Sequence, residues 1–536
     1  MSSEQRLWWR DGVIYQIYPR SFADSNGDGI GDLNGIVDHL DYLEELGVDA
    51  IWLSPIYPSP DVDFGYDVAD YKAIDPKFGT MDDFDRLTRE AHRRGIRIVL
   101  DLVLNHTSDQ HPWFRDSARA TDSPRRDWYI WRKPRPGGGP PNNWQSVFGG
   151  PAWEFDPATG EYYYHMFYKE QPDLNWRNPA VRKEMLDVFR FWLERGVDGF
   201  RLDVFNLYFK HPEMPDNPSK LGLRGFDRQH HIHDQDQPEM MPLLAEIRAL
   251  LDSYPERYAI GETFEGHDNP RRAAQYCGDG KLHAAFSFEF TKSPWRAADF
   301  LGAIQRWESA LPEDAWPNYV LNNHDVPRTA SRFGKGESDE RLKVAAALLL
   351  TQRGTPYLYY GEEIGMRDIQ VRRSEIQDPV GKRYWPFYRG RDGCRAPMQW
   401  DGSVNAGFSL KEPWLPVHPD YVTRNVAAQR GDPDSLFAFY RKLIALRKEV
   451  PVLRRGMTVP LTSDPRAVLA YLKQAGEQTA LVALNFSGRA LAVHLGPRLA
   501  GARWKLLLSN RRTEAAQVKD QRLPLGPYEV CILLQE

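Results

Sequence analysis

Three segments of the sequence share one pattern: a stretch with helical periodicity, then a glycine, then a short apolar run with the character of a strand. They read NGIVDHLDYLEELG before VDAIWLSP, MDDFDRLTREAHRRG before IRIVLDLVLNH, and VRKEMLDVFRFWLERG before VDGFRLDVFN. Gly47, Gly95 and Gly196 stand where each helix is predicted to end, because glycine readily adopts the left-handed conformation that closes helices. Each segment therefore predicts a helix followed by a buried strand.

Five further runs have strand character. VIYQIYPRSF precedes the first helix, and YAIGETF, AAFSFEF, NYVLNNHD and TPYLYYGEE follow the third unit, separated by stretches long enough for helices. Apolar strands that alternate with helices indicate a parallel sheet. Eight such strands predict an α/β fold with a closed (β/α)8 TIM barrel.

Irregular segments divide the chain into predicted domains. Residues 106–176, after the third strand, are rich in Pro, Gly, Trp and Tyr and too long for a βα loop, so we expect an inserted subdomain. The barrel then comprises 1–105 and 177–455, the second part with an irregular insert at about 366–430. Residues 456–536 alternate between strand-like runs without helices, which predicts a C-terminal antiparallel β-sandwich.

Composition narrows the classes of partner. The net charge of -5 gives no basic surface for nucleic acid. Apolar runs of about 18 residues are absent from the sequence, and MSSEQRLWWRDG lacks the apolar core of a signal peptide, so we expect neither membrane insertion nor export. Three widely spaced cysteines indicate neither a disulfide framework nor a metal-binding pair. We expect a cytoplasmic protein, monomeric or dimeric, with a small polar ligand.

Acidic residues stand at the ends of several predicted strands. Asp101 ends the third, Asp203 the fourth and Glu262 the fifth, and Asp325 follows the seventh. The C-terminal ends of barrel strands meet on one face, where active sites lie. Paired carboxylates without a cofactor motif favour cleavage of a glycosidic bond, in which one acid protonates the leaving oxygen while another attacks or stabilises the oxocarbenium-like centre. We expect no organic cofactor.

Four motifs carry a family resemblance. DLVLNH (101–106), GFRLD (199–203), GET (261–263) and NNHD (322–325) resemble, in this order, the four sequence regions of the α-amylase superfamily, glycoside hydrolase family thirteen. QPDLNW, DFGYDVADY, YYGEEIGM and CRAPMQWD are similar to its α-glucosidase and oligo-1,6-glucosidase branch. The resemblance implies that Asp203 is the nucleophile, Glu262 the general acid/base and Asp325 the transition-state stabiliser.

Arg201 lies two residues before Asp203, and residues i and i+2 of a strand point to the same side. Taken alone, this motif is also typical of a structural ion pair. Within the family pattern, we expect Arg201 to orient Asp203 and to keep it ionised, because a neighbouring cation lowers the pKa of a carboxylate.

The same resemblance implies substrate-binding residues. His106 and His324 would bond hydroxyls of the glucose being cleaved, and Tyr66 would stack on its ring. Asp63 and Arg395 would form a pair that closes the pocket beyond the non-reducing glucose, although an ordinary salt bridge is the alternative for Arg395.

Three apolar residues have both a functional and a structural interpretation. Phe148 and Phe167 would form an apolar wall, or belong to the core. Val204 matches the branch pattern associated with α-1,6 bonds, but a β-branched residue that simply ends a strand needs no functional explanation.

The loop DSNGDGIGD has the character of a cation site. Hard oxygen ligands at alternate positions suit Ca²⁺, and the candidates are Asp24, Asn26, Asp28, the Ile30 carbonyl and Asp32. The same residue types also form turns, and the twelfth-position Glu of an EF-hand is replaced by Gly35. The family resemblance implies a structural Ca²⁺ or Mg²⁺ away from catalysis.

The leading hypothesis is a retaining exo-α-glucosidase that releases glucose from short α-glucosides and prefers α-1,6 to α-1,4 bonds. A transglucosylase, or a sucrose or trehalose isomerase, would pass the same covalent intermediate to a sugar. Trehalose-6-phosphate hydrolases are also similar, but the sequence shows no dedicated phosphate-binding group. A non-catalytic transporter subunit is the remote alternative, and the presence of Asp203, Glu262 and Asp325 argues against it.

Overall fold

A computed structural model describes residues 6–264, 270–334, 336, 338–461, 467–514, 518 and 521–536. Its centre is a parallel sheet with the strand order β10-β11-β1-β2-β3-β7-β8-β9. These strands are β1 (Ile14–Ile17), β2 (Ala50–Leu53), β3 (Arg97–Leu102), β7 (Gly199–Leu202), β8 (Tyr258–Gly261), β9 (Ala284–Ala285), β10 (Asn318–Val320) and β11 (Thr355–Tyr359). They fall within the eight predicted runs, so the predicted barrel fold is confirmed.

The two end strands of this sheet are joined through a side chain. The amide of Asn318 on β10 donates to the Ala285 carbonyl of β9 at 2.5 Å and accepts from the backbone N–H of Ser287 at 3.2 Å. Asn318 is fully buried, and its side chain thus satisfies backbone groups where the two strands meet. The Asn318 side chain therefore joins β10 to β9 where the barrel closes.

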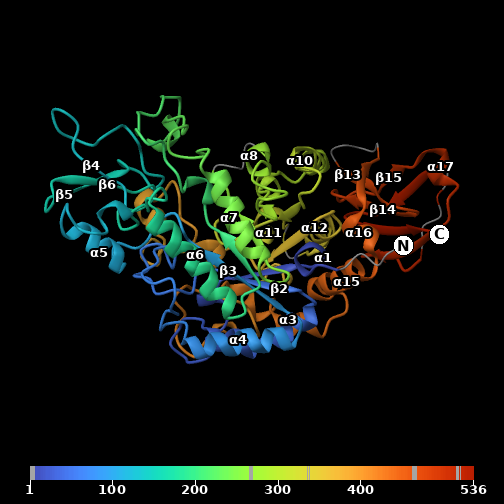
Figure 1. Cartoon of the computed structure of the whole chain (residues 1–536). Helices are drawn as coiled ribbons and strands as arrows, with labels where there is room; N and C mark the ends of the chain where they lie inside the picture. The colour runs from blue at the N-terminus through green and yellow to red at the C-terminus, as the bar shows by residue number, and fades with distance from the viewer. Residues whose placement is uncertain are drawn as a thin grey trace.

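Helices surround the barrel (Figure 1). The larger ones are α3 (Leu40–Leu46), α4 (Met81–Arg93), α6 (Pro179–Glu194), α7 (Met240–Asp252), α10 (Ala297–Ala310), α12 (Glu340–Leu350) and α15 (Leu436–Glu449). Shorter ones are α1 (Trp8–Asp11), α2 (Leu33–Asp38), α8 (Pro270–Ala274), α9 (Glu289–Lys292), α11 (Thr329–Phe333), α13 (Pro379–Tyr384), α14 (Val426–Arg430) and α16 (Pro451–Arg455).

The helix ends follow from local sequence. Thr80 and Asp83 form a reciprocal capping box at the start of α4. Gly47, Gly95 and Gly196 have φ values of 89°, 74° and 93°, the left-handed conformation predicted for them. The first predicted helix is nevertheless split into α2 and α3 at His39, which leaves helical geometry and whose Nδ1 lies 2.8 Å from the Gly35 carbonyl oxygen.

Two additional parts lie at opposite ends of the barrel (Figure 1). Within 106–176, α5 (Pro112–Arg119) accompanies an antiparallel sheet of β4 (Trp131–Arg132), β5 (Trp153–Asp156) and β6 (Glu161–Tyr164). At the other end, β12 (Met457–Pro460), β13 (Val468–Ala475), β14 (Gln478–Asn485), β16 (Trp504–Ser509) and β18 (Val530–Gln535) form one sheet, while β15 (Leu491–His494) and β17 (Arg522–Leu525) form a second. α17 (Gly496–Ala500) follows β15.

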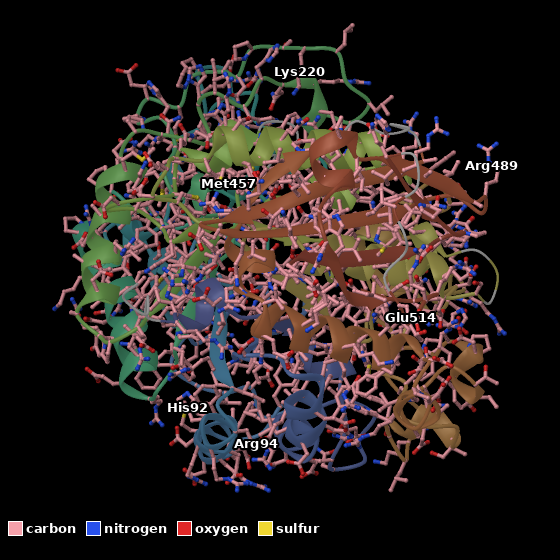
Figure 2. The ribbon with its side chains drawn as sticks, turned by 90° about the vertical axis from the view of Figure 1, so that its right-hand side faces the viewer. His92, Arg94, Lys220, Met457, Arg489 and Glu514 are labelled. Atoms are coloured by element: carbon pink, nitrogen blue, oxygen red, sulfur yellow. The ribbon has the colours of Figure 1, made fainter. Side chains whose placement is uncertain are left out.

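The C-terminal sheets share an apolar core. Leu481 and Leu533 of the larger sheet pack in one cluster with Val493 and Leu523 of the smaller sheet. Figure 2 shows this domain from its own side, with Met457, Arg489 and Glu514 labelled. Within the part of the chain that the structure describes, none of the helices combines the length and the apolar character that crossing a bilayer demands.

Candidate active site

Arg201 on β7 is buried among three carboxylates. Its Nη1 lies 2.8 Å from Asp101 Oδ1 and 2.6 Å from Asp203 Oδ1, and its Nη2 contacts Glu262. The register of the sheet places Asp101 on β3 opposite Arg201, and Glu262 directly follows β8. A buried charge is stable only where opposite charges and hydrogen bonds compensate it, so Arg201 allows these acids to share one interior site. The sheet thus brings together the acids that the sequence places at strand ends.

The pKa of Asp203 differs from the prediction. Burial raises it most strongly, Arg201 lowers it and the Asp101 carboxylate raises it, so that the pKa of Asp203 is about 6. The expected effect of Arg201 therefore has the predicted sign, but burial outweighs it. Burial likewise raises the pKa of Asp101 against the opposing effect of Arg201. The single positive charge of Arg201 therefore does not fully offset the cost of burying the negative charges of Asp101 and Asp203.

Asp325 shows the opposite shift. Partial removal from water raises its pKa, but His324, Arg391 and Arg395 outweigh this and hold the pKa well below its usual range. The carboxylate lies 3.1 Å from His324 Nε2, 2.9 Å from Arg395 Nη2 and 3.4 Å from Arg391 Nη1. Environments that push the pKa values of neighbouring carboxyls apart are typical of sites that divide acid and base roles.

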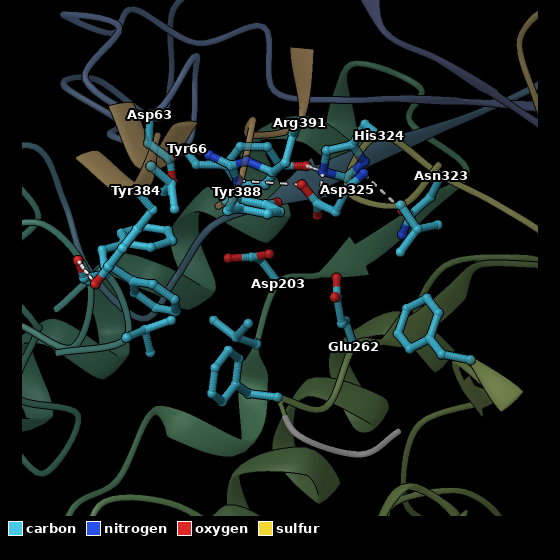
Figure 3. A pocket seen from close by; sticks show the side chains of 18 of the residues that line it. Asp63, Tyr66, Asp203, Glu262, Asn323, His324, Asp325, Tyr384, Tyr388 and Arg391 are labelled. Atoms are coloured by element: carbon cyan, nitrogen blue, oxygen red, sulfur yellow. Dashed lines mark hydrogen bonds and ion pairs between the residues drawn. The ribbon is translucent and has the colours of Figure 1, made fainter. Parts of the chain in front are cut away.

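A cavity of about 650 Å³ opens above these acids. Of the predicted catalytic and substrate-binding residues, those that line it are Asp63, Tyr66, His106, Phe148, Phe167, Asp203, Val204, Glu262, His324 and Asp325. Figure 3 shows Asp203 and Glu262 on one side, with Tyr66, His324 and Asp325 facing them. Arg201 and Arg395 instead contact the catalytic acids from behind the cavity wall.

Tyr66 and His324 form a fixed polar wall. Their rings stack at 5.4 Å between centroids, and the Tyr66 hydroxyl lies 2.8 Å from His324 Nε2 and donates to Asp101 at 3.1 Å. Gln16 Nε2 donates to His324 Nδ1 at 2.8 Å, so the hydrogen of the neutral imidazole lies on Nε2. Burial lowers the pKa of His324, which favours this neutral form. His324 therefore presents an N–H toward Tyr66 and Asp325.

His106 is positioned from the neighbouring loop. Its Nε2 lies 2.9 Å from the Tyr66 carbonyl oxygen and 3.1 Å from Gln171 Nε2, while Asn105 Nδ2 lies 3.2 Å from its Nδ1. Both ring nitrogens thus have protein partners. His106 lines the cavity beside Phe167, whose ring centroid is 5.2 Å away.

The predicted pairing of Asp63 with Arg395 is wrong. Asp63 Oδ1 pairs with Arg391 Nη2 at 2.7 Å, and Arg391 is also held by Asp378 at 3.0 Å. Arg395 is only 1% exposed, because its Nε donates to the His324 carbonyl at 2.8 Å and its Nη2 pairs with Asp325. These contacts hold the side chain of Arg395 in the cavity wall behind Asp325.

Arg391 and Asp378 are site residues that the sequence pattern did not reveal. The stretch RGRDGCRAP contains Arg389, Arg391 and Arg395, and its letters do not reveal which of them reaches the pocket. Residues 392–395 form a turn of 3-10 helix, which brings Arg391 and Arg395 to the same carboxylate of Asp325. Asp378 is fully buried and caps α13 through the Val380 N–H.

Val204 has an unusual backbone. β7 ends at Leu202, and Val204 has φ 33° and ψ 41°, in the left-handed region that β-branched residues rarely adopt. The alternative that Val204 merely ends a strand is therefore wrong. Such strain is concentrated at functional sites, and Val204 lines the cavity directly after Asp203. Phe148 and Phe167, 5.6 Å apart between ring centroids, form an apolar part of the same wall.

The Asp24–Asp32 loop lies away from this cavity. Asp24 accepts from the backbone of Gly27 at 2.7 Å and of Gly29 at 2.8 Å, and Asp32 caps α2 through the Gly35 N–H at 2.7 Å. Asn26 and Asp28 likewise accept from backbone N–H groups within the loop. Among the described residues, no three His, Cys, Asp or Glu side chains converge as a metal-binding group. The predicted cation, including the role of the Ile30 carbonyl, stays a prediction.

Comparison with known proteins places this site in a family. Residues 16–456 match the alpha amylase catalytic domain, and residues 459–532 match the maltogenic amylase C-terminal domain. A probable alpha-glucosidase of Rhizobium meliloti is 44% identical, with 91% of each chain covered. An oligo-1,6-glucosidase of Parageobacillus thermoglucosidasius is 43% identical over 98% of this chain and 99% of its own.

Solved structures agree with this assignment. The alpha-glucosyl transfer enzyme XgtA is 40% identical, with a TM-score of 0.92 over 99% of this chain and 100% of its own. The trehalulose synthase MutB from Pseudomonas mesoacidophila is 35% identical, with a TM-score of 0.90 over the same shares. The chain therefore belongs to the alpha-amylase family of glycoside hydrolases.

Proposed function

We propose that this glycoside hydrolase is a retaining exo-α-glucosidase that releases α-glucose from the non-reducing ends of short α-glucosides. The observation that carries this proposal is the Asp63–Arg391 ion pair, backed by Asp378, at the wall of the cavity that holds Asp203. An ion pair across one end of a cavity leaves no passage for a longer chain, which favours removal of a terminal sugar.

In the proposed reaction, Asp203 attacks the anomeric carbon while Glu262 protonates the leaving oxygen. Glu262 then removes a proton from a water molecule, which attacks the anomeric carbon and releases the sugar from Asp203. Each of the two steps inverts the anomeric carbon, so the α configuration is retained. Asp325 contributes a fixed negative charge, because its low pKa keeps it ionised. Arg201 orients both Asp203 and Glu262 through its two terminal nitrogens.

We propose a preference for α-1,6 over α-1,4 bonds. Val204 lines the cavity with a strained backbone one residue after the proposed nucleophile, so its side chain bears on how the leaving sugar approaches. The oligo-1,6-glucosidase relative at 43% identity supports this preference. Initial rates on isomaltose and maltose, with products followed by proton NMR, test it. Faster maltose cleavage or release of β-glucose would overturn, respectively, the linkage preference and the retaining mechanism.

Transfer to a sugar is the second candidate function. The similarity to an alpha-glucosyl transfer enzyme and to a trehalulose synthase supports it, since both acceptors, water and sugar, would use one intermediate. In the same NMR experiment, new disaccharides formed from sucrose or trehalose, without isomaltose cleavage, would favour this function.

A phosphorylated sugar is a poorer fit, although a trehalose-6-phosphate hydrolase of Bacillus subtilis is 39% identical. Among the described residues that line the cavity, the strong cations are Arg224 and Arg391. Arg224 binds Asp227 through two 2.9 Å bonds, and Arg391 binds Asp63 and Asp378. A phosphate would compete with these carboxylates.

We further propose a structural Ca²⁺ or Mg²⁺ at the loop of Asp24, Asn26 and Asp28. Carboxylate and amide oxygens keep additional lone pairs beyond those used by the backbone, so the donor chemistry fits.

A cytoplasmic location is supported by Cys277, Cys394 and Cys531, which are all free and buried.

A further inference from the structure

Asp67 is a buried acid beside the catalytic cavity that does not itself line it. It directly follows Tyr66 in the stretch DFGYDVADY, and 0% of its surface is exposed. Burying a carboxylate is costly unless other groups compensate its charge. Asp67 therefore needs specific partners at this position.

These partners are three donors of the preceding loop. Asp67 Oδ1 accepts from the Ser59 hydroxyl at 2.7 Å and from the Asp63 N–H at 3.0 Å, and Oδ2 accepts from the Val62 N–H at 2.9 Å. Burial raises the pKa of Asp67 to about 6, although the three hydrogen bonds lower it. The carboxyl is therefore ionised at neutral pH, and both of its oxygens bind the loop of residues 59–67.

The backbone on either side of Asp63 is strained. Asp61 and Phe64 have φ values of 64° and 49°, in the left-handed region that residues other than glycine seldom adopt. Such a conformation persists only where the surrounding structure determines it. Val62 and Asp63, whose N–H groups bind Asp67, stand between the two strained residues.

The two strained residues have anchors of their own on the outer side of the loop. Asp61 pairs with Arg20 at 2.7 Å and with Lys77 at 2.6 Å. The Arg20 guanidinium lies 5.0 Å from the ring centroid of Phe64 and 5.1 Å from that of Trp414. These contacts do not reach the main chain between the strained residues, which is instead bound by the buried carboxylate.

Asp63 is thus held from two sides. Its Oδ1 pairs with Arg391 Nη2 at 2.7 Å, and its N–H donates to Asp67. Arg391 is itself bound by Asp378 at 3.0 Å and by Asp325 at 3.4 Å. Because Arg391 has these other partners, the place of Asp63 in the ion pair depends on the loop that carries it.

We propose that Asp67 is a positioning residue for substrate binding, whose carboxylate holds the main chain of Asp63 so that the Asp63 side chain closes the cavity with Arg391. This inference rests on the proposed function, in which that ion pair bounds the site of the terminal glucose. Asp67 acts through Asp63 and does not contact the sugar. Its loss should weaken binding of the substrate and of the transition state alike, so KM should rise while kcat changes little.

Asp67→Asn tests the inference. Asparagine offers one acceptor oxygen and turns its amide N–H groups toward a backbone N–H, so a bond from Val62 or from Asp63 is lost. KM is measured at about pH 7.5, where Asp67 is ionised, for whichever of isomaltose and maltose is cleaved faster. We expect it to rise about tenfold, near the lower end of what a hydrogen bond to a charged group contributes. Asp70→Asn is the matched control, because Asp70 is exposed on the same segment, and it should change neither KM nor kcat.

A second background separates positioning from a structural role. In Arg391→Ala the side chain of Asp63 has lost its partner, so adding Asp67→Asn should raise KM by less than about twofold. Two residues that act independently would give the full tenfold increase again, because independent effects add. Ser59→Ala removes one donor to Asp67 but keeps the carboxylate. It should raise KM by a smaller factor, and it takes the place of Asp67→Asn in both backgrounds if that variant does not fold.

The outcomes distinguish the inference from the proposed function. An unchanged KM in an Asp67→Asn enzyme whose circular dichroism shows it folded, or equal increases in the two backgrounds, would overturn the inference alone. An unchanged KM in Arg391→Ala would overturn the inference together with the proposed closure of the cavity. Cleavage of neither disaccharide by the unmodified enzyme would overturn the proposed function and the inference that rests on it.

Discussion

Asp101→Asn should move the acid limb of the pH profile to lower pH. Asp203 must be ionised to attack, and its pKa of about 6 predicts that kcat/KM falls as the pH drops through that value. The Asp101 carboxylate raises this pKa, so neutralising it should allow Asp203 to remain ionised in more acidic solution.

The magnitude follows from the geometry around Arg201. Asp101 Oδ1 and Asp203 Oδ1 lie 2.8 and 2.6 Å from the same nitrogen. Their separation is therefore at most about 5.4 Å, at which two like charges repel by about 3 kcal/mol with an effective dielectric constant near 20. Arg201 offsets part of this repulsion, and one pKa unit corresponds to about 1.4 kcal/mol. We expect a shift of about 1 to 2 pH units.

The assay is kcat/KM for isomaltose between about pH 4 and 8. Asp70→Asn is the control, because Asp70 is exposed and does not line the cavity. An unchanged acid limb in a folded Asp101→Asn enzyme would refute the claim that the charge of Asp101 sets the pKa of Asp203. A shift to higher pH would refute its sign.

Three further perturbations separate the proposed roles. Glu262→Gln should lower hydrolysis of isomaltose by about 10²–10⁴, and hydrolysis of α-glucosyl fluoride far less, because fluoride needs less protonation to leave; equal losses in steady-state kinetics would contradict the acid role. Arg391→Ala should raise KM for isomaltose by about 10- to 100-fold, because charged hydrogen bonds are lost. Arg395 lies behind Asp325, so Arg395→Ala should act mainly on kcat. The same changes of KM and kcat in both variants would contradict this distinction. EDTA should lower the calorimetric Tm by a few degrees, Ca²⁺ should restore it, and Asp28→Ala should abolish the response; an unchanged Tm would argue against the cation.

The fold was predictable because its signals are local and repeated. Each helix that ends at a left-handed glycine and is followed by an apolar run defines one unit, and eight strands leave few alternatives to a barrel. The break at His39 was not predictable, since the apolar period continues through it. The closure of the barrel through Asn318 was also not predictable. A polar residue at the start of a strand is equally typical of a turn, and the sequence does not show that its side chain bonds Ala285 on the strand across the closure.

The site was predictable where the barrel determines it. Asp101, Asp203 and Glu262 converge because parallel strands end together. Arg391 and Asp378 belong to the irregular insert, where no periodicity relates position in the sequence to position in space. The net pKa of Asp203 was hidden for a different reason: a sequence shows that a cation is adjacent, but not how deeply the pair is buried or how many acids share that cation.

Charge balance explains why two catalytic carboxyls in one cavity shift in opposite directions. Arg201 faces Asp101, Asp203 and Glu262, so one positive charge serves three acids. Asp325 has Arg391 and Arg395 beside it, together with the N–H of His324. Because the acids around Arg201 outnumber its charge, burial raises the pKa values of Asp101 and Asp203 although Arg201 lowers both. The barrel thus carries the acids, while the insert after β11 supplies the cations that keep Asp325 ionised.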